Sequence, residues 1–290
     1  MKKIITILLL LTFYKAKSQP YLDIAYLKFQ HSPSAGLWSR NNTTNKFNFF
    51  NAGMNIPFQF KKDSSVLVVS MAAELWNVEI KGITNMPGSF QSLIVPLTYV
   101  KPLSQKWTLS ITGIARWNGT NKELFRNSFQ KGGALLATYK KKKDLHFKFG
   151  FYYNSEFSGR FIVPLAGIDW KINNKNNLFG VLPGNLVYEH KLNTHFYWGL
   201  AFKAITNSYI SQNIISSSSQ KFLRVDDNQL SLFIDNYLSK KLVLTTEIGH
   251  SALRKFRLGI RDASTKYFYE AKMNDDLLFK ISFSYRVRFR

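Results

Sequence analysis

The stretch Asp275–Arg290, DDLLFKISFSYRVRFR, alternates between apolar and polar side chains over nearly its whole length. Successive side chains of a β-strand point to opposite faces. One face would carry Leu277, Phe279, Ile281, Phe283, Tyr285, Val287 and Phe289. The other face would carry Leu278, Lys280, Ser282, Ser284, Arg286 and Arg288. Seven alternate apolar positions, rich in aromatics, favour a strand whose outer side faces lipid.

The same two-faced pattern recurs along the chain. The predicted strands are 21–30, 46–60, 65–76, 90–101, 106–117, 129–140, 145–154, 160–172, 195–205, 227–237, 241–250 and 275–289. Some connections are short, such as Lys61–Ser65 and Lys140–Asp144, whereas others are long and polar, such as Ser32–Lys46 and Thr206–Asp226. Tight turns that alternate with extended loops are typical of transmembrane barrels.

These segments predict an all-β fold, a closed antiparallel transmembrane β-barrel of twelve strands. Closure is required because hydrocarbon cannot satisfy an open sheet edge. The segment 173–194 is interrupted by Pro183-Gly184, and proline is poorly tolerated inside a sheet. We therefore expect an irregular excursion there. If this segment instead forms a small hairpin about Pro183-Gly184, the barrel has fourteen strands.

The N-terminal residues have the layout of a secretory signal. Lys2 and Lys3 precede an apolar run, Ile4–Phe13, and a small-x-small cleavage site follows at Ala16–Ser18. The apolar run is shorter than the roughly 20 residues that a membrane-spanning helix needs. We expect residues 1–18 to be a cleaved signal peptide and 19–290 to form one barrel domain in the outer membrane.

The chain is strongly basic, with a formal charge of +23. Removing the four lysines of the predicted signal peptide leaves +19. An exported protein seldom meets nucleic acid, so we expect no nucleic-acid partner. Outer-membrane lipid headgroups, lipopolysaccharide phosphates and small anionic solutes are the partners that this charge favours. The sequence does not indicate an oligomeric state.

Catalytic and metal-binding patterns are weak. The chain has no cysteine, which excludes disulfides and thiolate chemistry. The pairs His31-Ser32 and His250-Ser251 are adjacent, and neighbours on a strand point to opposite faces, so neither pair predicts a nucleophile with its base. The sequence therefore assigns no catalytic residue, no metal site and no cofactor, and leaves enzymatic activity open.

Basic residues on the polar strand faces are the stronger signal. Alternation predicts that the barrel lumen contains Arg116, Lys148, Arg160, Lys203, Lys280, Arg286 and Arg288. Few acids are expected beside them, Glu74 and Glu247 among these. A cationic interior favours anions, because charged side chains at a constriction set ion selectivity. An open pore and a barrel filled by its own side chains both remain compatible with this pattern.

The stretch Val163–Phe202 carries a family likeness. Its distinctive pieces are Pro164–Trp170 (PLAGIDW), Leu178–Pro183 (LFGVLP) and Tyr197–Phe202 (YWGLAF). They resemble a family of functionally uncharacterised outer-membrane β-barrel proteins of Gram-negative bacteria. The resemblance implies an outer-membrane barrel and supplies no activity.

The function expected from the sequence is a non-enzymatic outer-membrane barrel with a structural, binding or narrow anion-favouring channel role. Two alternatives stay open. One is a barrel enzyme that hydrolyses lipid, and the other is a soluble periplasmic β-protein that binds an anionic ligand.

Overall fold

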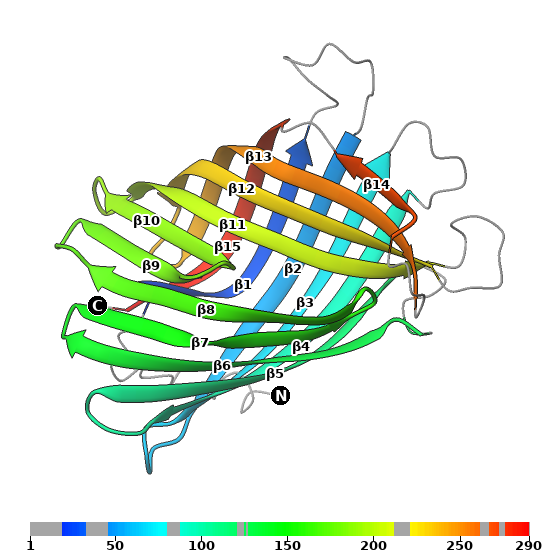
Figure 1. The fold of residues 1–290 in the computed structure, drawn as a ribbon. Helices are drawn as coiled ribbons and strands as arrows, with labels where there is room; N and C mark the ends of the chain where they lie inside the picture. Colours follow the sequence, from blue (N-terminus) through cyan, green and yellow to red (C-terminus); the bar gives the residue numbers. More distant parts are fainter. Residues whose placement is uncertain are drawn as a thin grey trace, which may run out of the picture.

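The protein folds into a β-barrel in the computed structural model (Figure 1). The structure describes residues 19–32, 46–79, 88–120, 125, 127–211, 221–261, 267–272 and 276–289. The predicted signal peptide, 1–18, lies outside the described residues. No helix among the described residues is long and apolar enough to cross a bilayer.

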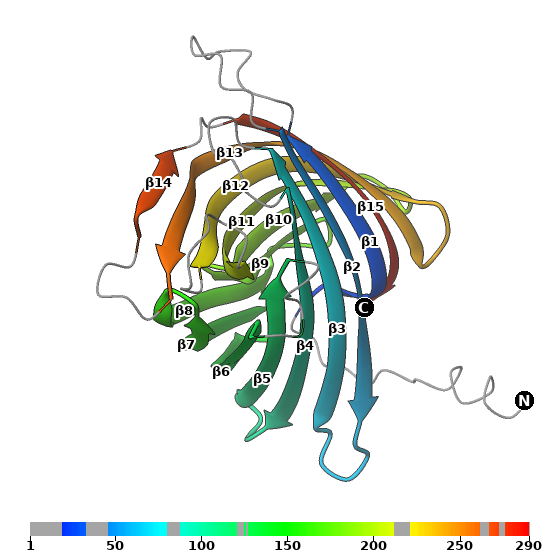
Figure 2. The same cartoon turned by 90° about the vertical axis from the view of Figure 1, so that its right-hand side faces the viewer.

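Fifteen strands occur in the described part of the chain. They are β1 (Tyr21–Ser32), β2 (Lys46–Gln59), β3 (Val66–Glu79), β4 (Ser89–Pro102), β5 (Trp107–Gly119), β6 (Phe129–Lys142), β7 (Leu145–Glu156), β8 (Gly159–Lys171), β9 (Asn176–Leu182), β10 (Asn185–Lys191), β11 (Phe196–Ser211), β12 (Lys221–Tyr237), β13 (Leu242–Ile260), β14 (Tyr269–Lys272) and β15 (Asp276–Arg288). Each strand from β1 to β11 pairs antiparallel with the next strand along the chain, and β12 pairs antiparallel with β13. β15 joins β13 to β1, while the short β14 pairs with the far end of β13. The ring that closes contains fourteen strands (Figure 2).

The count of twelve is wrong, and the alternative of fourteen is confirmed. β9 and β10 form a hairpin about Pro183-Gly184, in the segment expected to be irregular. Pro183 is tolerated because it lies in the turn, where no strand partner needs its missing N–H group. β9 and β10 have seven residues each, so the barrel wall is shorter along these two strands than along the other strands of the ring.

The outer face of the barrel carries the predicted apolar rows. On β15, Phe279, Ile281, Phe283 and Tyr285 are exposed, whereas Ser282, Ser284 and Arg286, which alternate with them, are buried. Exposed apolar side chains also line β2, β6 and β7. A soluble barrel would put such side chains inside, so this inversion is the pattern of a wall that faces lipid.

The barrel has two unlike ends. At one end, which we call the short-turn end, lie the turns 61–65, 103–106, 143–144, 172–175, 192–195 and 238–241. The opposite end, which we call the loop end, lies where β1, β3, β5, β11 and β13 finish. Parts of the predicted loop 206–226, and of the segment between the predicted strands 241–250 and 275–289, are strand in the structure. β11, β12 and β13 run further toward the loop end than their apolar alternation indicates.

The long ends of β11–β13 turn into the barrel. β11 leaves the wall above the low β9–β10 hairpin, and its Ile210 pairs in parallel with Gly119 of β5. A β-bulge lies between β12 and β13, where Asp227 stands opposite Leu253 and Arg254. A bulge bends its strands and adds twist. Leu253 adopts a positive φ of 56° there.

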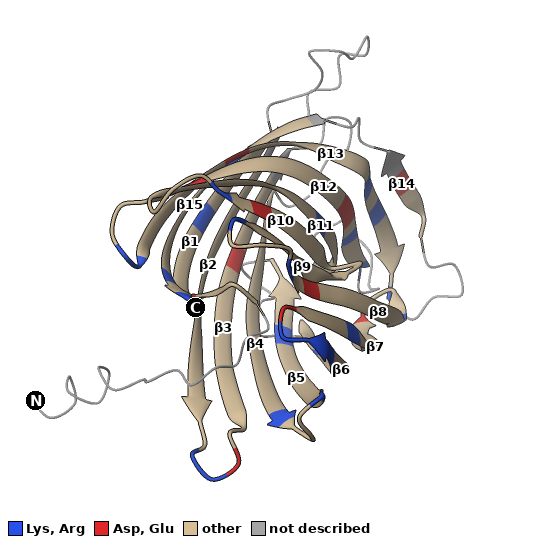
Figure 3. Ribbon diagram, turned by 90° about the vertical axis from the view of Figure 1, so that its left-hand side faces the viewer, with Lys and Arg blue, Asp and Glu red and all other residues tan. Residues whose placement is uncertain are grey.

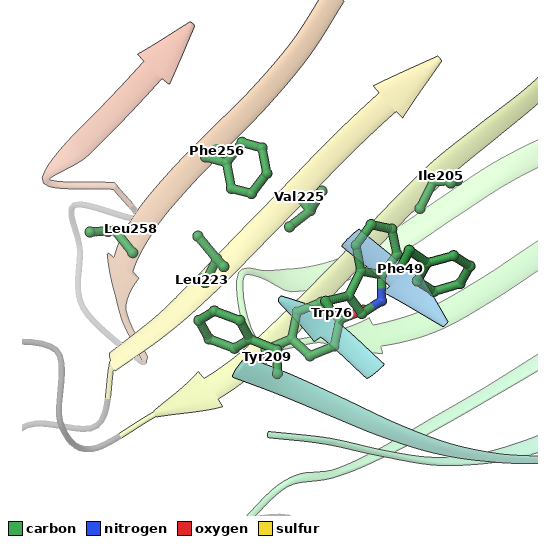
Figure 4. Packing of buried hydrophobic residues seen from close by; sticks show 9 residues of the cluster. Phe49, Trp76, Ile205, Tyr209, Leu223, Val225, Phe256 and Leu258 are labelled. Atoms are coloured by element: carbon green, nitrogen blue, oxygen red, sulfur yellow. The ribbon is translucent and has the colours of Figure 1, made fainter. Parts of the chain in front are cut away.

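A hydrophobic cluster fills the loop end, and we call it the cap (Figure 4). It consists of Phe49, Trp76 and Phe90 from β2–β4 and Ile205, Tyr209, Leu223, Val225, Phe256 and Leu258 from β11–β13. These strands belong to opposite walls, so the side chains meet across the lumen. All nine are buried. The cap therefore spans the lumen between two walls of the barrel toward the loop end.

Candidate functional site in the barrel interior

Two predicted arginines form a network at the short-turn end. Arg286 on β15 donates to Asp23 of β1 at 2.6 Å and to Asp235 of β12 at 2.5 Å. Its guanidinium also lies 3.8 Å from the ring centroid of Tyr21. Asp23 stands opposite Arg286 in the strand register, so this ion pair fixes the seam between β15 and β1, while Asp235 comes from β12, beyond the intervening β13.

Arg288 continues this network across several strands. It binds both carboxylate oxygens of Glu189 on β10, at 3.0 and 2.5 Å, and donates to the hydroxyl of Tyr237. Its guanidinium also stacks 3.9 Å from the ring centroid of Tyr197. Bidentate pairs of this kind combine charge with fixed geometry. Together, the Arg286 and Arg288 contacts form what we call the arginine network.

Three other predicted residues have polar partners. Lys148 is buried in an ion pair with Asp169 at 2.8 Å. Lys280 binds Glu247 at 3.2 Å, and Arg116 donates to Asn207 of β11 at 2.8 Å. The Arg116 contact helps to hold the inturned end of β11 against β5. Figure 3 shows how acidic positions accompany the basic ones along the strands.

Arg160 does not join this set. It is exposed, and alternation along β8 places it on the face of Ile162, opposite the face of the buried Asp169. β8 is apolar on both faces, so its sequence gives alternation little contrast to follow. Arg160 stands in register with Ser155, near the loop end.

Carboxylates on the inner strand faces are more numerous than the sequence pattern suggested. Besides Glu74 and Glu247, they are Asp23, Glu156, Asp169, Glu189, Asp227 and Asp235. Glu189 was not predicted because it lies in the segment 173–194, which was expected to be irregular. Asp227 lies at the β-bulge between β12 and β13. Arg286 and Arg288 are therefore neutralised by carboxylates, whereas Lys28 and Lys203 are exposed.

Lys203 and Lys28 differ from the paired cations. Both occupy inner strand faces, Lys203 in register with the buried Gln229 and Lys28 with the buried Asn51. Both are nevertheless exposed, so the lumen is solvent-accessible at their level. Lys28 was not among the predicted residues, although alternation with Gln30 along β1 could have found it. With Lys280 they form a group that we call the lysine cluster.

The histidine–serine pairs are not arranged as nucleophile and base. The ring of His250 contacts the backbone carbonyl of Ser251 at 2.8 Å. The Ser251 hydroxyl donates to Asp227 at 2.6 Å and accepts from Arg254 at the same distance. These contacts brace the bulge. Among the described residues, no group of three or more acidic or histidine side chains is placed to hold a metal ion.

Comparison with solved structures finds barrels of low sequence identity. The NanC porin is 11% identical, with 90% of this chain and 100% of that chain covered and a TM-score of 0.40. The KdgM porin in complex with disordered oligogalacturonate is 7% identical, with 91% and 99% covered and a TM-score of 0.38. The deltaS2S3 mutant of the TodX monoaromatic hydrocarbon channel is 10% identical, with 93% and 91% covered and a TM-score of 0.41.

No curated protein matches the chain. A family profile, described as a domain of unknown function, DUF6268, matches residues 14–290. That span includes every strand described above, so the chain belongs to the DUF6268 family.

Proposed function

We propose that this protein is an outer-membrane β-barrel that binds a solute in its lumen and does not act as an open pore. In this proposal residues 1–18 direct export and are removed, and 19–290 form the barrel. The observation that carries it is the cap. In the cap, Trp76 and Tyr209 come from opposite walls and are both fully buried in the same hydrophobic cluster. A packed apolar core leaves no path for hydrated ions.

The rest of the barrel agrees with a lumen that is accessible from the short-turn end. Inner-facing residues of β3–β6 below the cap are small or of middle size and half-buried; they include Ser70, Ala72, Thr98, Thr112 and Ala134. Since short turns face the periplasm in outer-membrane barrels, this opening would be periplasmic. Anions are the favoured solutes because Lys28 and Lys203 face this space.

The outer surface suits lipopolysaccharide. Lys131 and Arg160 are exposed near the loop end, on the face that carries the apolar rows. They flank Ser155, which stands in register with Arg160 and accepts a hydrogen bond from the Lys131 amide. In this proposal the two cations meet the phosphates of the outer leaflet.

Conductance measurements test the sealed barrel. We expect the purified protein to migrate differently on gels before and after heating, as a folded barrel does, and to produce no stable porin-like current steps in planar bilayers. The double variant Trp76→Ala/Tyr209→Ala removes two large cap side chains and should increase the current. The control Phe149→Ala/Phe151→Ala, on the outer face, should leave it unchanged. Large, stable steps from the unmodified protein would refute the proposal.

A further inference from the structure

We propose that the lysine cluster is a binding site for a small oxyanion, a carboxylate or a phosphate, held below the cap. This inference rests on the proposed function, because it requires a lumen that is open only on one side.

The strand register brings the three lysines together. On the wall formed by β15 and β1, Lys280 stands opposite Gln30, and Lys28 lies two residues further along β1. Diagonal neighbours of this kind are roughly 7–8 Å apart. Lys203 reaches the same place from β11, with its ammonium 5.9 Å from the ring centroid of Phe49, whose strand partner is Gln30. The Lys203 ammonium lies within electrostatic range of both Lys280 and Lys28.

Two of these cations lack a carboxylate partner. Lys280 is paired with Glu247, which also accepts from Ser231. Among the contacts of the described residues, Lys203 has the Phe49 ring and Lys28 has the Tyr26 ring, 4.6 Å from its ammonium. Both rings present a π face and no countercharge. Two like charges that face one lumen repel each other, and a bound anion relieves that repulsion.

The surroundings supply neutral donors and a single further acid. Gln30 is buried between Lys280 and Phe49 in the register, and its side-chain nitrogen has no hydrogen-bond acceptor. Asn51 lies beside Lys28 and donates to Glu74 at 3.1 Å. The charges of Lys280 and Glu247 cancel. The ammonium groups of Lys28 and Lys203 then remain, with Glu74 as the single carboxylate beside them. The remaining charge is positive, so the site favours an anion of one or two charges.

A glycine shapes this wall. The Tyr26 ring lies across Gly53, where an added Cβ would come within 2.4 Å of the tyrosine hydroxyl. Gly53 therefore lets Tyr26 lie flat against β2, beside Lys28. The ring takes up little of the lumen in this position, which leaves the ammonium group accessible.

Binding to the full-length protein in a neutral detergent tests the site. The probes are inorganic phosphate for phosphates and succinate for carboxylates, titrated by calorimetry at low ionic strength. We expect saturable binding of at least one probe. The double variant Lys28→Gln/Lys203→Gln should weaken it by about tenfold or more. The control Lys61→Gln/Lys240→Gln removes the same charge from exposed turns and should bind as the unmodified protein does.

The outcomes separate the two proposals. Binding of inorganic phosphate alone or of succinate alone identifies the preferred oxyanion. No saturable binding of either probe overturns the lysine site, and so does an equal loss in the control variant, which would indicate attraction to the overall charge. Neither result affects the sealed barrel, because the absence of current steps is measured independently of binding.

Discussion

Replacement of Arg286 by alanine should destabilise the barrel by about 3–5 kcal/mol. The side chain is 4% exposed and binds Asp23 and Asp235, so its removal leaves two carboxylates in the wall without their cation. An uncompensated charge in a buried site is costly because protein replaces its water. Urea unfolding in a fixed lipid or detergent, followed by tryptophan fluorescence, gives the free energy of unfolding.

Two further variants show whether the loss comes from the buried charges. Lys240→Ala removes a cation from an exposed turn and should change the stability by less than about 0.5 kcal/mol. The triple variant Arg286→Met/Asp23→Asn/Asp235→Asn removes the cation and both acids, and it should recover much of the lost stability. If Arg286→Ala and Lys240→Ala cost the same, the network does not stabilise the seam.

An arginine in place of Leu135 should cost about 2–4 kcal/mol. Leu135 lies at the middle of β6 and points outward, with 48% of its surface exposed. In a bilayer that position faces hydrocarbon, where a guanidinium cannot be solvated. The same unfolding measurement in lipid vesicles gives the cost.

The neighbouring residue provides a matched control. Ala134 lies on the opposite face of β6, in register with Thr112 and Tyr152, and is half-buried. Arginine there enters the lumen, where water is accessible, and should cost less than about 1 kcal/mol. Equal costs at the two positions would contradict a lipid-facing outer wall.

Alternation along the sequence was sufficient to predict the barrel and its outer face. Phe279, Ile281 and Phe283 were placed correctly because a two-residue period survives in every regular strand. The same rule failed on β8, where both faces are apolar, and Arg160 was assigned to the lumen. The β9–β10 hairpin was missed for another reason, because Pro183-Gly184 was taken as a break in the sheet although it forms the turn of that hairpin.

The partners of the interior residues could not be predicted in the same way. Arg288 reaches Glu189 from a strand at the other end of the chain, and no local pattern records such a pairing. The bulge at Asp227 shifts the inward phase of β13 from Ser251 to Arg254, so a strict alternation loses register there. The cap likewise depends on how far β11–β13 turn inward, which long-range packing decides.

The seam between β1 and β15 has a consequence for the order of folding. The ion pair between Asp23 and Arg286 joins residues 263 positions apart, so forming it closes a loop that contains nearly the whole chain. Contacts of such long sequence separation are slow to form because loop closure must come first. Until then both edge strands are unpaired and can add a foreign strand. The last stage of assembly is thus the stage at which this barrel is most exposed to mispairing.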